Sequence, residues 1–284
     1  MRSRLSSTLG IPRSTGYYHH TLPDRDEALR IRIETVMKDN PAYGHERIAM
    51  ALNEGTERIR RVMRKFGLQP TIRRVKPWQK PEVTDNAVLA GLQNLIRDRR
   101  AERPFHIWAS DFTYIWFNGM WYYLATVLDI YNREIVGWQL GKRSKAQLIH
   151  LAYCDALSKH PPPGILHVDR GSQYTAASTK RLAAMTNTAM SYSDPGSPWQ
   201  NGFQESHYGN FKLELGDTTR FEHEGELFEG IAKQIYYYNH KRIHTALRTN
   251  PVQYRKNYEQ QNKRTTSTTD VRKSYRMGVG KSRG

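Results

Sequence analysis

Three short amphipathic segments near the N-terminus predict a small helical domain. Apolar residues recur at helical spacing over 28–39, 44–53 and 56–67, and Thr56 is placed to N-cap the third helix. The third helix carries basic side chains away from its apolar stripe, including Arg58, Arg61, Arg64 and Lys65. This pattern favours a helix-turn-helix whose third helix enters a DNA major groove. A small bundle with a solvated basic face fits the same segment.

Beyond residue 105 the pattern changes from helical to strand periodicity. β-branched and aromatic runs cover 108–117, 121–130 and 133–141, and Asn118-Gly119 between the first two is a hairpin signal. A helical stretch, a buried-type strand, a helix and a short strand follow, at 144–160, 165–169, about 178–187 and 189–193. Three antiparallel strands followed by alternating helices and strands predict a mixed α/β sheet covered by helices.

The segments around this α/β domain are basic and poor in core-forming patterns. Residues 70–104 are rich in Pro and Arg and predict a linker, within which 87–100 is expected to add a helix. The tail is polar and basic and is expected to be disordered until it meets a partner. The predicted organisation is a helical DNA-binding domain, the linker, an α/β core and the tail, at 1–69, 70–104, 105–254 and 255–284.

The uneven distribution of charge points to a phosphate polymer as partner. Of the net charge of +17, residues 1–104 hold 21 Lys/Arg against 12 Asp/Glu, residues 105–250 hold 14 against 13, and residues 251–284 hold 9 against 2. A near-neutral middle between basic flanks suits nucleic acid, because each neutralised phosphate releases counterions. Ordinary solvation of Lys and Arg is the alternative, and the motifs described below favour DNA.

Other compositional features exclude several classes of protein. Cys154 is the only cysteine, so an internal disulfide and a multi-cysteine zinc site are both excluded. No apolar run approaches the roughly 18 residues of a membrane span, and the mean hydropathy is −0.77. The basic N-terminus lacks the apolar region of a targeting peptide. We therefore expect a cytoplasmic protein without a membrane partner.

Two aspartates lie where strand residues are expected. Asp111 lies inside the first strand run, where a carboxylate is costly unless it is solvated, paired or bound to a metal ion. Asp169 closes the strand at 165–169, and sites collect at the carboxyl ends of strands in open α/β sheets. Each aspartate alone is weak evidence, because a strand-end Asp often only caps a turn.

Glu205 adds a third carboxylate on a predicted helix. Asn201 is a plausible N-cap, and an apolar stripe faces the protein, formed by Phe203, His207, Phe211 and Leu215. Asn201, Glu205 and Lys212 fall together on the opposite, outward side, with Lys212 about 10 Å along the helix from Glu205. That side offers a carboxylate to a metal ion and an ammonium to a phosphate, although a solvated polar face explains the spacing equally well.

Several sequence blocks, taken together, resemble one known family. W-x-x-D-F-T-Y at 108–114, H-V-D-R-G-S-Q-Y at 167–174 and S-P-W-Q-N-G-x-x-E-S at 197–206 are similar to the signature blocks of insertion-sequence transposases related to retroviral integrases. More narrowly, the chain resembles the second-reading-frame (OrfB) protein of the IS-three family. The 35 residues between Asp169 and Glu205 match that family's D,D(35)E spacing, and Lys212 matches its basic residue. The resemblance runs from about Ile11 to Tyr254, with Gln200 replacing an acidic residue of many relatives.

The resemblance implies a fold and a mechanism. It implies a ribonuclease-H-like catalytic domain of the retroviral-integrase type, in which Asp111, Asp169 and Glu205 bind two Mg²⁺ or Mn²⁺ ions. Asp111 would bridge the metal ions, while Asp169 and Glu205 would each complete one site. Water and then a DNA 3′-hydroxyl would attack in line, cutting the ends of a mobile element and joining them to DNA. Hard carboxylates suit these cations, and two ions activate the nucleophile and stabilise the leaving oxygen.

The resemblance also implies partners. These are double-stranded DNA at element ends and target, further copies of the chain on that DNA, and an upstream-frame (OrfA-type) segment. No heptad pattern follows Met1. We therefore expect a downstream portion whose end selectivity and multimer formation increase when the upstream segment is fused to it.

Alternative interpretations were weighed against this one. A structure-selective nuclease without strand transfer shares the chemistry, and an inactive relative would act only as a DNA-binding regulator. His167 and Arg170 form an H-x-x-R also used by tyrosine recombinases, but no surrounding block resembles that family. Asp129 and Asp155 are interpreted as structural or surface residues. The aromatic residues of 114–123 could stack on bases, but strand aromatics are more often core.

Overall fold

The computed structural model describes residues 22–71, 92–97, 99–142, 145–194 and 202–263, while the side chains of 145, 172 and 202–206 lie outside this description. The chain forms two compact units, Met1–Thr71 and Ile72–Gly284, and each is described by itself. Within the described residues no helix is both long and apolar enough to cross a bilayer.

In residues 22–71 the first unit forms three helices, as the sequence predicts. They are α3 (Leu22–Asp39), α4 (His45–Leu52) and α5 (Thr56–Lys65). The first helix begins at Leu22 rather than at residue 28. Thr56 was expected to be the N-cap of α5, but it is the first helical residue and Gly55 is the N-cap, with an extended backbone and no side-chain cap. The apolar stripes meet in a buried core formed by Leu29, Ile33, Ile48, Ile59 and Val62.

The second unit is built on a five-stranded mixed sheet with strand order β3-β2-β1-β4-β5. Its strands are β1 (Ile107–Phe117), β2 (Met120–Asp129), β3 (Ile135–Gly141), β4 (Ile165–Val168) and β5 (Ala189–Tyr192). The first three strands are antiparallel, and β4 and β5 run parallel to β1. Asn118 and Gly119 join β1 to β2 with φ values of 45° and 74°, as a two-residue hairpin of type I′ requires.

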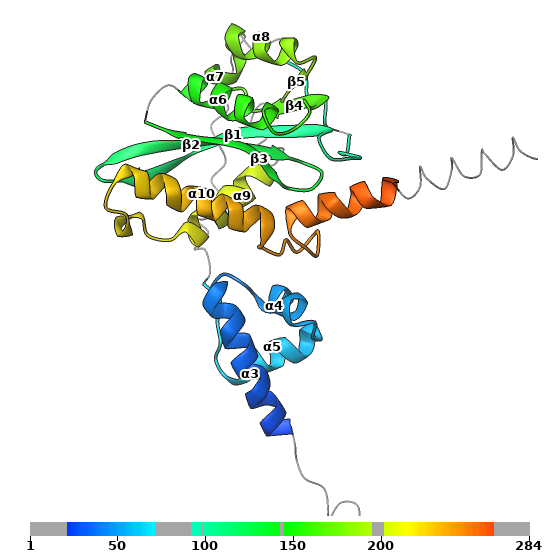
Figure 1. Cartoon of the computed structure of the whole chain (residues 1–284), viewed down its shortest axis with the longest axis vertical. Coiled ribbons are helices and arrows are strands. Elements are labelled where there is room, and N and C mark those ends of the chain that lie inside the picture. The colour runs from blue at the N-terminus through cyan, green and yellow to red at the C-terminus, as the bar shows by residue number, and fades with distance from the viewer. Residues whose placement is uncertain (1–21, 72–91, 98, 143–144, 195–201, 264–284) are drawn as a thin grey trace, which may run out of the picture. The chain divides into compact units, whose positions relative to one another are not determined.

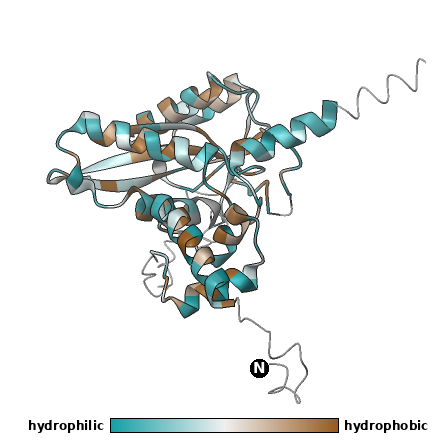
Figure 2. Ribbon diagram, turned by 60° about the horizontal axis from the view of Figure 1, so that its bottom comes forward, coloured by the Kyte–Doolittle hydropathy of each residue, from teal (hydrophilic) through white to brown (hydrophobic). Residues whose placement is uncertain are grey.

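Helices cover both faces of the sheet (Figure 1). One face packs against α6 (Lys145–Leu157), α7 (Ser172–Thr175) and α8 (Ala177–Met185). The other face packs against α9 (Gly202–Leu215) and α10 (Glu224–His240), with the short 3-10 helix η3 (Thr218–Arg220) between them. Apolar positions lie on the strands and on the helices beside them, whereas the C-terminal helix is largely hydrophilic (Figure 2). This layered α/β arrangement confirms the predicted fold class.

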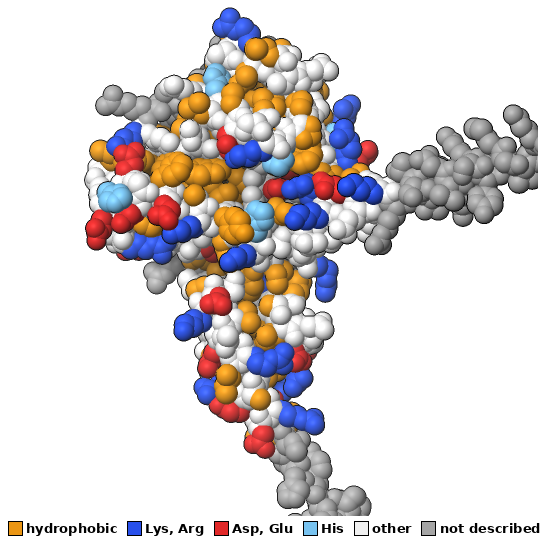
Figure 3. Space-filling model, in the orientation of Figure 1, with side chains coloured by type: hydrophobic (Ala, Val, Ile, Leu, Met, Phe, Trp, Pro, Cys, Tyr) orange, Lys and Arg blue, Asp and Glu red, His pale blue; other side chains and the backbone are white. Residues whose placement is uncertain are grey.

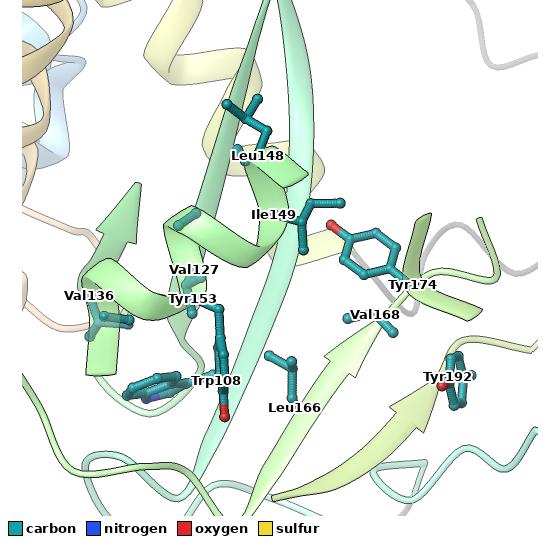
Figure 4. Packing of buried hydrophobic residues seen from close by; sticks show 13 residues of the cluster. Trp108, Val127, Val136, Leu148, Ile149, Tyr153, Leu166, Val168, Tyr174 and Tyr192 are labelled. Carbon is teal, nitrogen blue, oxygen red and sulfur yellow. The ribbon is translucent and has the colours of Figure 1, made fainter. Parts of the chain in front are cut away.

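The core beneath α6 is tightly packed. Trp108 is fully buried and makes an edge-to-face contact with Tyr153, at 5.9 Å between ring centroids (Figure 4). Gly137 on β3 lets α6 approach the sheet closely, since a Cβ at this position would lie 2.6 Å from the Ala156 main-chain nitrogen. Only glycine fits between β3 and α6 here without displacing the helix.

The helix expected over 87–100 is not formed in its described part. Residues 92–97 run along the sheet edge and make a turn. The Tyr192 amide donates to the Gln93 carbonyl at 2.9 Å, and the Leu95 amide donates to Ser191 Oγ at 2.9 Å. These bonds satisfy groups at the edge of β5, so this end of the predicted linker belongs to the α/β unit. Residues 72–91 lie outside the described residues.

A further helix covers 251–263, after the α/β core, whereas disorder was expected from residue 255. Arg255 pairs with Glu134 at 2.8 Å, and Tyr131 contacts the rings of Tyr254 and Tyr258. These contacts attach the helix to the turn between β2 and β3. The remainder of the predicted tail lies outside the described residues.

Candidate active site

Asp111 and Asp169 lie side by side at the centre of the sheet. Strands β1 and β4 pair in parallel, with Ala109 opposite His167 as the last paired residues. Each aspartate lies two residues beyond these paired residues, Asp111 within β1 and Asp169 directly after the end of β4, so strand alternation directs both side chains to the same face of the sheet. Neighbouring strands are about 4.8 Å apart, which brings these two carboxylates within reach of one ligand. Sequence separation alone does not predict this adjacency, because it depends on β4 pairing with β1.

Asp169 occupies a tight turn after β4. Its Oδ1 accepts a hydrogen bond from the Gly171 amide at 2.8 Å, and a Cβ on Gly171 would lie 2.9 Å from the same oxygen. Burial raises the pKa of Asp169 above the ordinary value of 3.8, and the hydrogen bond from Gly171 opposes that shift. A desolvated carboxylate with a raised pKa gains from a nearby cation, and such groups cluster at functional sites.

Two buried tyrosines flank Asp111. The Tyr208 hydroxyl on α9 donates to the Asp111 main-chain oxygen at 2.6 Å, while the Tyr174 hydroxyl on α7 lies 3.4 Å from Ser110 Oγ. Burial raises the pKa of both tyrosines well above 10, and the Asp111 charge raises both further. Asp169 adds to the shift at Tyr174, so both carboxylates lie near this hydroxyl, which Figure 4 shows directed toward β1.

Neither tyrosine was singled out from the sequence. Each is one of 17 tyrosines; Tyr174 closes the block at 167–174 but was given no role, and Tyr208 lies outside the apolar stripe of its helix. The hydrogen bond from the Tyr208 hydroxyl to the Asp111 carbonyl joins residues 97 positions apart, so it depends on the tertiary structure. The position of Tyr208, three residues after Glu205, is the one signal that could have drawn attention to it.

Glu205 lies in the first half of α9, and its side chain is outside the described residues. The predicted apolar stripe is confirmed where it is described, since His207, Phe211 and Leu215 are buried. The side opposite was expected to face outward, and Lys212 is indeed exposed. Tyr208, however, lies at the border of that side and is buried against β1 and β2. The edge of α9 next to Glu205 therefore faces the strand that carries Asp111. Asn201 lies outside the described residues.

The donor set suits a hard divalent cation. Asp111 and Asp169 supply carboxylate oxygens, which Mg²⁺ and Mn²⁺ prefer. No group of three His, Cys, Asp or Glu side chains positioned for a metal ion occurs among the side chains described, a set that does not include Glu205. The two described carboxylates have the donor chemistry that such an ion prefers, and the participation of Glu205 stays a prediction.

The predicted DNA-binding cations on α5 are largely engaged in ion pairs. Arg61 and Lys65 both bind the buried Asp26 on α3, with Arg61 Nη1 and Lys65 Nζ each 2.8 Å from Asp26 Oδ2. These bonds, Arg61 first, hold the pKa of the Asp26 carboxyl well below its ordinary value. Arg58 pairs with Glu54 at 2.9 Å. Arg64 is exposed and has no acidic partner within the described part of the chain.

These pairs change the interpretation of the basic helix. Arg61 and Lys65 fasten α5 to α3, although their side chains remain 44% and 43% exposed. Basic and acidic side chains are interspersed over the visible face of this unit (Figure 3). A role of all four cations in DNA binding remains a prediction, and Arg64 is the one without a structural pairing in the described residues.

Two further groups of residues are placed by the structure. His167 is buried, with its ring nitrogens 2.9 Å from Ser191 Oγ and 3.2 Å from Ser193 Oγ, and Arg170 donates to the Ser193 carbonyl. The polar groups of His167 and Arg170 therefore bind other residues of the fold, whereas a tyrosine recombinase would need both side chains open to DNA. Asp129 is also structural, since it accepts bonds from the Phe105 and Tyr131 amides.

The aromatic residues of the hairpin were expected to be core, but three of them are exposed. Tyr114, Trp116 and Trp121 have exposed fractions of 42%, 49% and 52%. Their rings contact one another across β1 and β2, with 4.9 Å between the centroids of Trp116 and Trp121. On the face of these three residues the hairpin extends past α6 (Figure 1), whereas Ile115, Phe117 and Tyr122 on its other face are buried with residues of α9 and α10. Strand periodicity alone did not reveal the exposure.

The strand order and the helical layers are those of the ribonuclease-H-like fold of retroviral integrase catalytic cores. A solved intasome of simian T-cell lymphotropic virus shares this fold with a TM-score of 0.51 and 16% sequence identity, covering 78% of this chain and 74% of the viral chain. Integrase core domain models match residues 101–198 and 186–251, which include both aspartates and Glu205.

Curated relatives narrow the class. The transposase for insertion sequence element IS904 of Lactococcus lactis is 33% identical over 230 residues, which cover 78% of this chain and 90% of the relative. The putative transposase InsK for IS150 of Escherichia coli is 30% identical, covering 86% and 90%. The chain belongs to the insertion-sequence transposases of the IS-three family that carry an integrase core domain.

Proposed function

We propose that this chain is a DNA transposase subunit that cuts DNA at the ends of a mobile element and joins those ends to target DNA. The observation that carries the proposal is that Asp111 lies on β1 and Asp169 directly follows β4, the parallel strand beside it, within the residues that match the integrase core. Glu205 completes the catalytic set from the facing helix α9. Similarity to named transposases over most of the chain supports the same reaction.

The residues have distinct roles in this proposal. Asp111, Asp169 and Glu205 hold two Mg²⁺ or Mn²⁺ ions, which when bound supply an activated oxygen nucleophile and stabilise the leaving oxygen. Gly171 holds Asp169 in its turn through the 2.8 Å amide bond. Lys212, exposed on the helix that carries Glu205, offers its ammonium to a DNA phosphate. Asn201, which directly precedes α9 in the sequence, also contacts DNA.

The partners follow from charge and family. The chain carries +17, which suits double-stranded DNA at both the element ends and the target. Arg58, Arg61, Arg64 and Lys65 contribute contacts from the helical unit, aided by the basic flanks. Further copies of the chain assemble on the DNA, an OrfA-type segment adds end selectivity, and the reaction takes place in the bacterial cytoplasm.

The test is a set of single variants at the carboxylates. Asp111→Asn, Asp169→Asn and Glu205→Gln should each abolish DNA cutting and joining, while DNA affinity and fold are retained. Glu229→Gln is the matched control, because Glu229 is an exposed glutamate on α10 whose ion pair is with Lys233, one turn along the same helix. Mg²⁺ or Mn²⁺ should support activity and EDTA should abolish it.

The products distinguish the competing functions. Joined products on labelled end DNA support a transposase, whereas cutting without joining indicates a structure-selective nuclease. Binding without either indicates a regulator. Near-normal activity in any carboxylate variant, or full activity in EDTA, would contradict the assigned site.

A further inference from the structure

Tyr208 connects the helix that carries Glu205 to the strand that carries Asp111. Its side chain is buried, with an exposed fraction of 6%. The hydroxyl donates to the Asp111 main-chain oxygen at 2.6 Å and lies 2.8 Å from Thr126 Oγ1. A phenol has one hydrogen, so Thr126 must be the donor in the second bond. One oxygen atom thus joins α9 to both β1 and β2.

The contact of the Tyr208 hydroxyl lies close to two of the predicted metal-binding residues, Asp111 and Glu205. Asp111 and Thr126 are directly opposite in the β1–β2 register, so Tyr208 binds both members of one cross-strand pair. Along α9, Tyr208 follows Glu205 by three residues, which is about 4.5 Å of helical rise. The hydroxyl therefore fixes α9 against β1 less than one helical turn from Glu205.

We infer that Tyr208 is a positioning residue that sets the separation of Glu205 from Asp111 and thereby the affinity for metal ions. The inference rests on the proposed function, since it assigns Glu205 and Asp111 to one metal site. Phe211 and Leu215 hold α9 against the sheet by apolar contacts, while Glu214 pairs with Arg242 at 2.6 Å and accepts a hydrogen bond from Gln234 on α10, which fixes α9 to α10 rather than to β1. Apolar packing is not directional, whereas two hydrogen bonds to one oxygen restrict both the sliding and the rotation of the helix.

Metal sites are sensitive to small displacements of this kind. Ligand distances must lie within about 0.2 Å of their preferred values. Groups that orient metal ligands typically contribute about 10- to 100-fold in metal affinity. Removing the Tyr208 hydroxyl should therefore affect metal binding more than it affects folding.

The test compares two Tyr→Phe variants of the full-length chain. Tyr208→Phe removes the contact, and Tyr153→Phe is the matched control. Tyr153 is buried and its hydroxyl also makes two contacts, at 3.0 Å to Thr186 and to Thr188, neither of which carries a candidate ligand. Mn²⁺ binding is measured by electron paramagnetic resonance without DNA, alongside metal-dependent nicking and urea denaturation.

Both variants should lower the urea midpoint to a similar extent. Tyr208→Phe should weaken Mn²⁺ binding about tenfold and raise the Mn²⁺ concentration for half-maximal nicking in parallel. Tyr153→Phe should leave both quantities within about twofold of wild type, because its contacts lie outside the site. Equal Mn²⁺ affinities in the two variants, with a wild type that binds Mn²⁺ and nicks DNA, would overturn the positioning role and leave the proposed function intact.

Thr126→Val provides a second variant should Tyr208→Phe fail to fold. It removes the bond donated to Tyr208 but keeps the bond to Asp111, so Mn²⁺ binding should weaken by less than in Tyr208→Phe. In the Tyr208→Phe background it should add no further loss, because Thr126 acts through Tyr208. Full additivity of the two losses would contradict the inference. A wild type without Mn²⁺ binding or nicking would overturn the proposed function and this inference together.

Discussion

Replacing Gly137 with alanine would insert a methyl group between β3 and α6. The new Cβ would lie 2.6 Å from the main-chain nitrogen and 2.7 Å from the Cβ of Ala156, and closer still to the Ala152 carbonyl oxygen. Comfortable contacts between such atoms are about 3.5–4.0 Å. Because two of the three contacts are with backbone atoms, rotation of a side chain cannot relieve them. The helix must move away by roughly 1 Å.

The displacement would loosen a large part of the core. Helix α6 contributes Leu148, Ile149, Ala152, Tyr153 and Ala156 to the main buried cluster. Overpacking typically costs about 1–3 kcal/mol, and a clash with backbone falls at the upper end. We expect Gly137→Ala to lower the free energy of unfolding by about 3 kcal/mol, a large fraction of the roughly 5–15 kcal/mol that stabilises a domain.

Urea denaturation followed by tryptophan fluorescence measures this loss. Gly164→Ala is the control in the same unit, because a Cβ there would lie 3.4 Å from its nearest neighbour, the His106 carbonyl oxygen. The control should change the free energy of unfolding by less than about 1 kcal/mol, with an unchanged denaturant slope in both variants. Equal losses for the two variants would refute the close-approach argument.

Two further predictions concern pH and DNA. Burial raises the pKa of Asp129 to about 7 from 3.8, so the folded state retains a proton that the unfolded state releases. The stability of wild type relative to Asp129→Asn should therefore fall as pH rises from about 4 to 7 and level off above it, and a pH-independent difference in urea midpoints would contradict this. Arg64→Ala should weaken binding to all DNA sequences alike and lower the salt slope by about one, whereas Arg61→Ala should mainly destabilise the helical unit because it removes a partner of Asp26. Unchanged DNA affinity in Arg64→Ala would exclude its role.

The sequence by itself determined the features that depend on local chemistry. Asn118-Gly119 specifies a hairpin because both residues tolerate the positive φ values that a type I′ turn requires. Strand and helix periodicity placed the five strands, since buried positions must repeat at the period of their element. Asp111, Asp169 and Glu205 emerged as candidates from their motifs and spacing, and their role as a catalytic set stays a prediction.

Contacts between distant segments were decided only by the tertiary structure. By sequence Arg61 and Lys65 form an open basic face, but in the structure both pair with the buried Asp26 on α3, 35 and 39 residues earlier in the chain. The helix expected within 87–100 gives way at 92–97 to a segment that ends in a turn, because Gln93 and Leu95 form hydrogen bonds with residues of β5.

The exposure of the hairpin aromatic residues was also decided by the tertiary structure. Trp116 and Trp121 have the strand pattern of core residues, yet the hairpin that carries them extends past α6 and leaves them exposed. The bond from Tyr208 to Asp111 spans 97 residues, and periodicity cannot reveal it because it depends on how α9 lies against the sheet. A sequence pattern determines which face of an element is apolar, but only packing determines what that face meets.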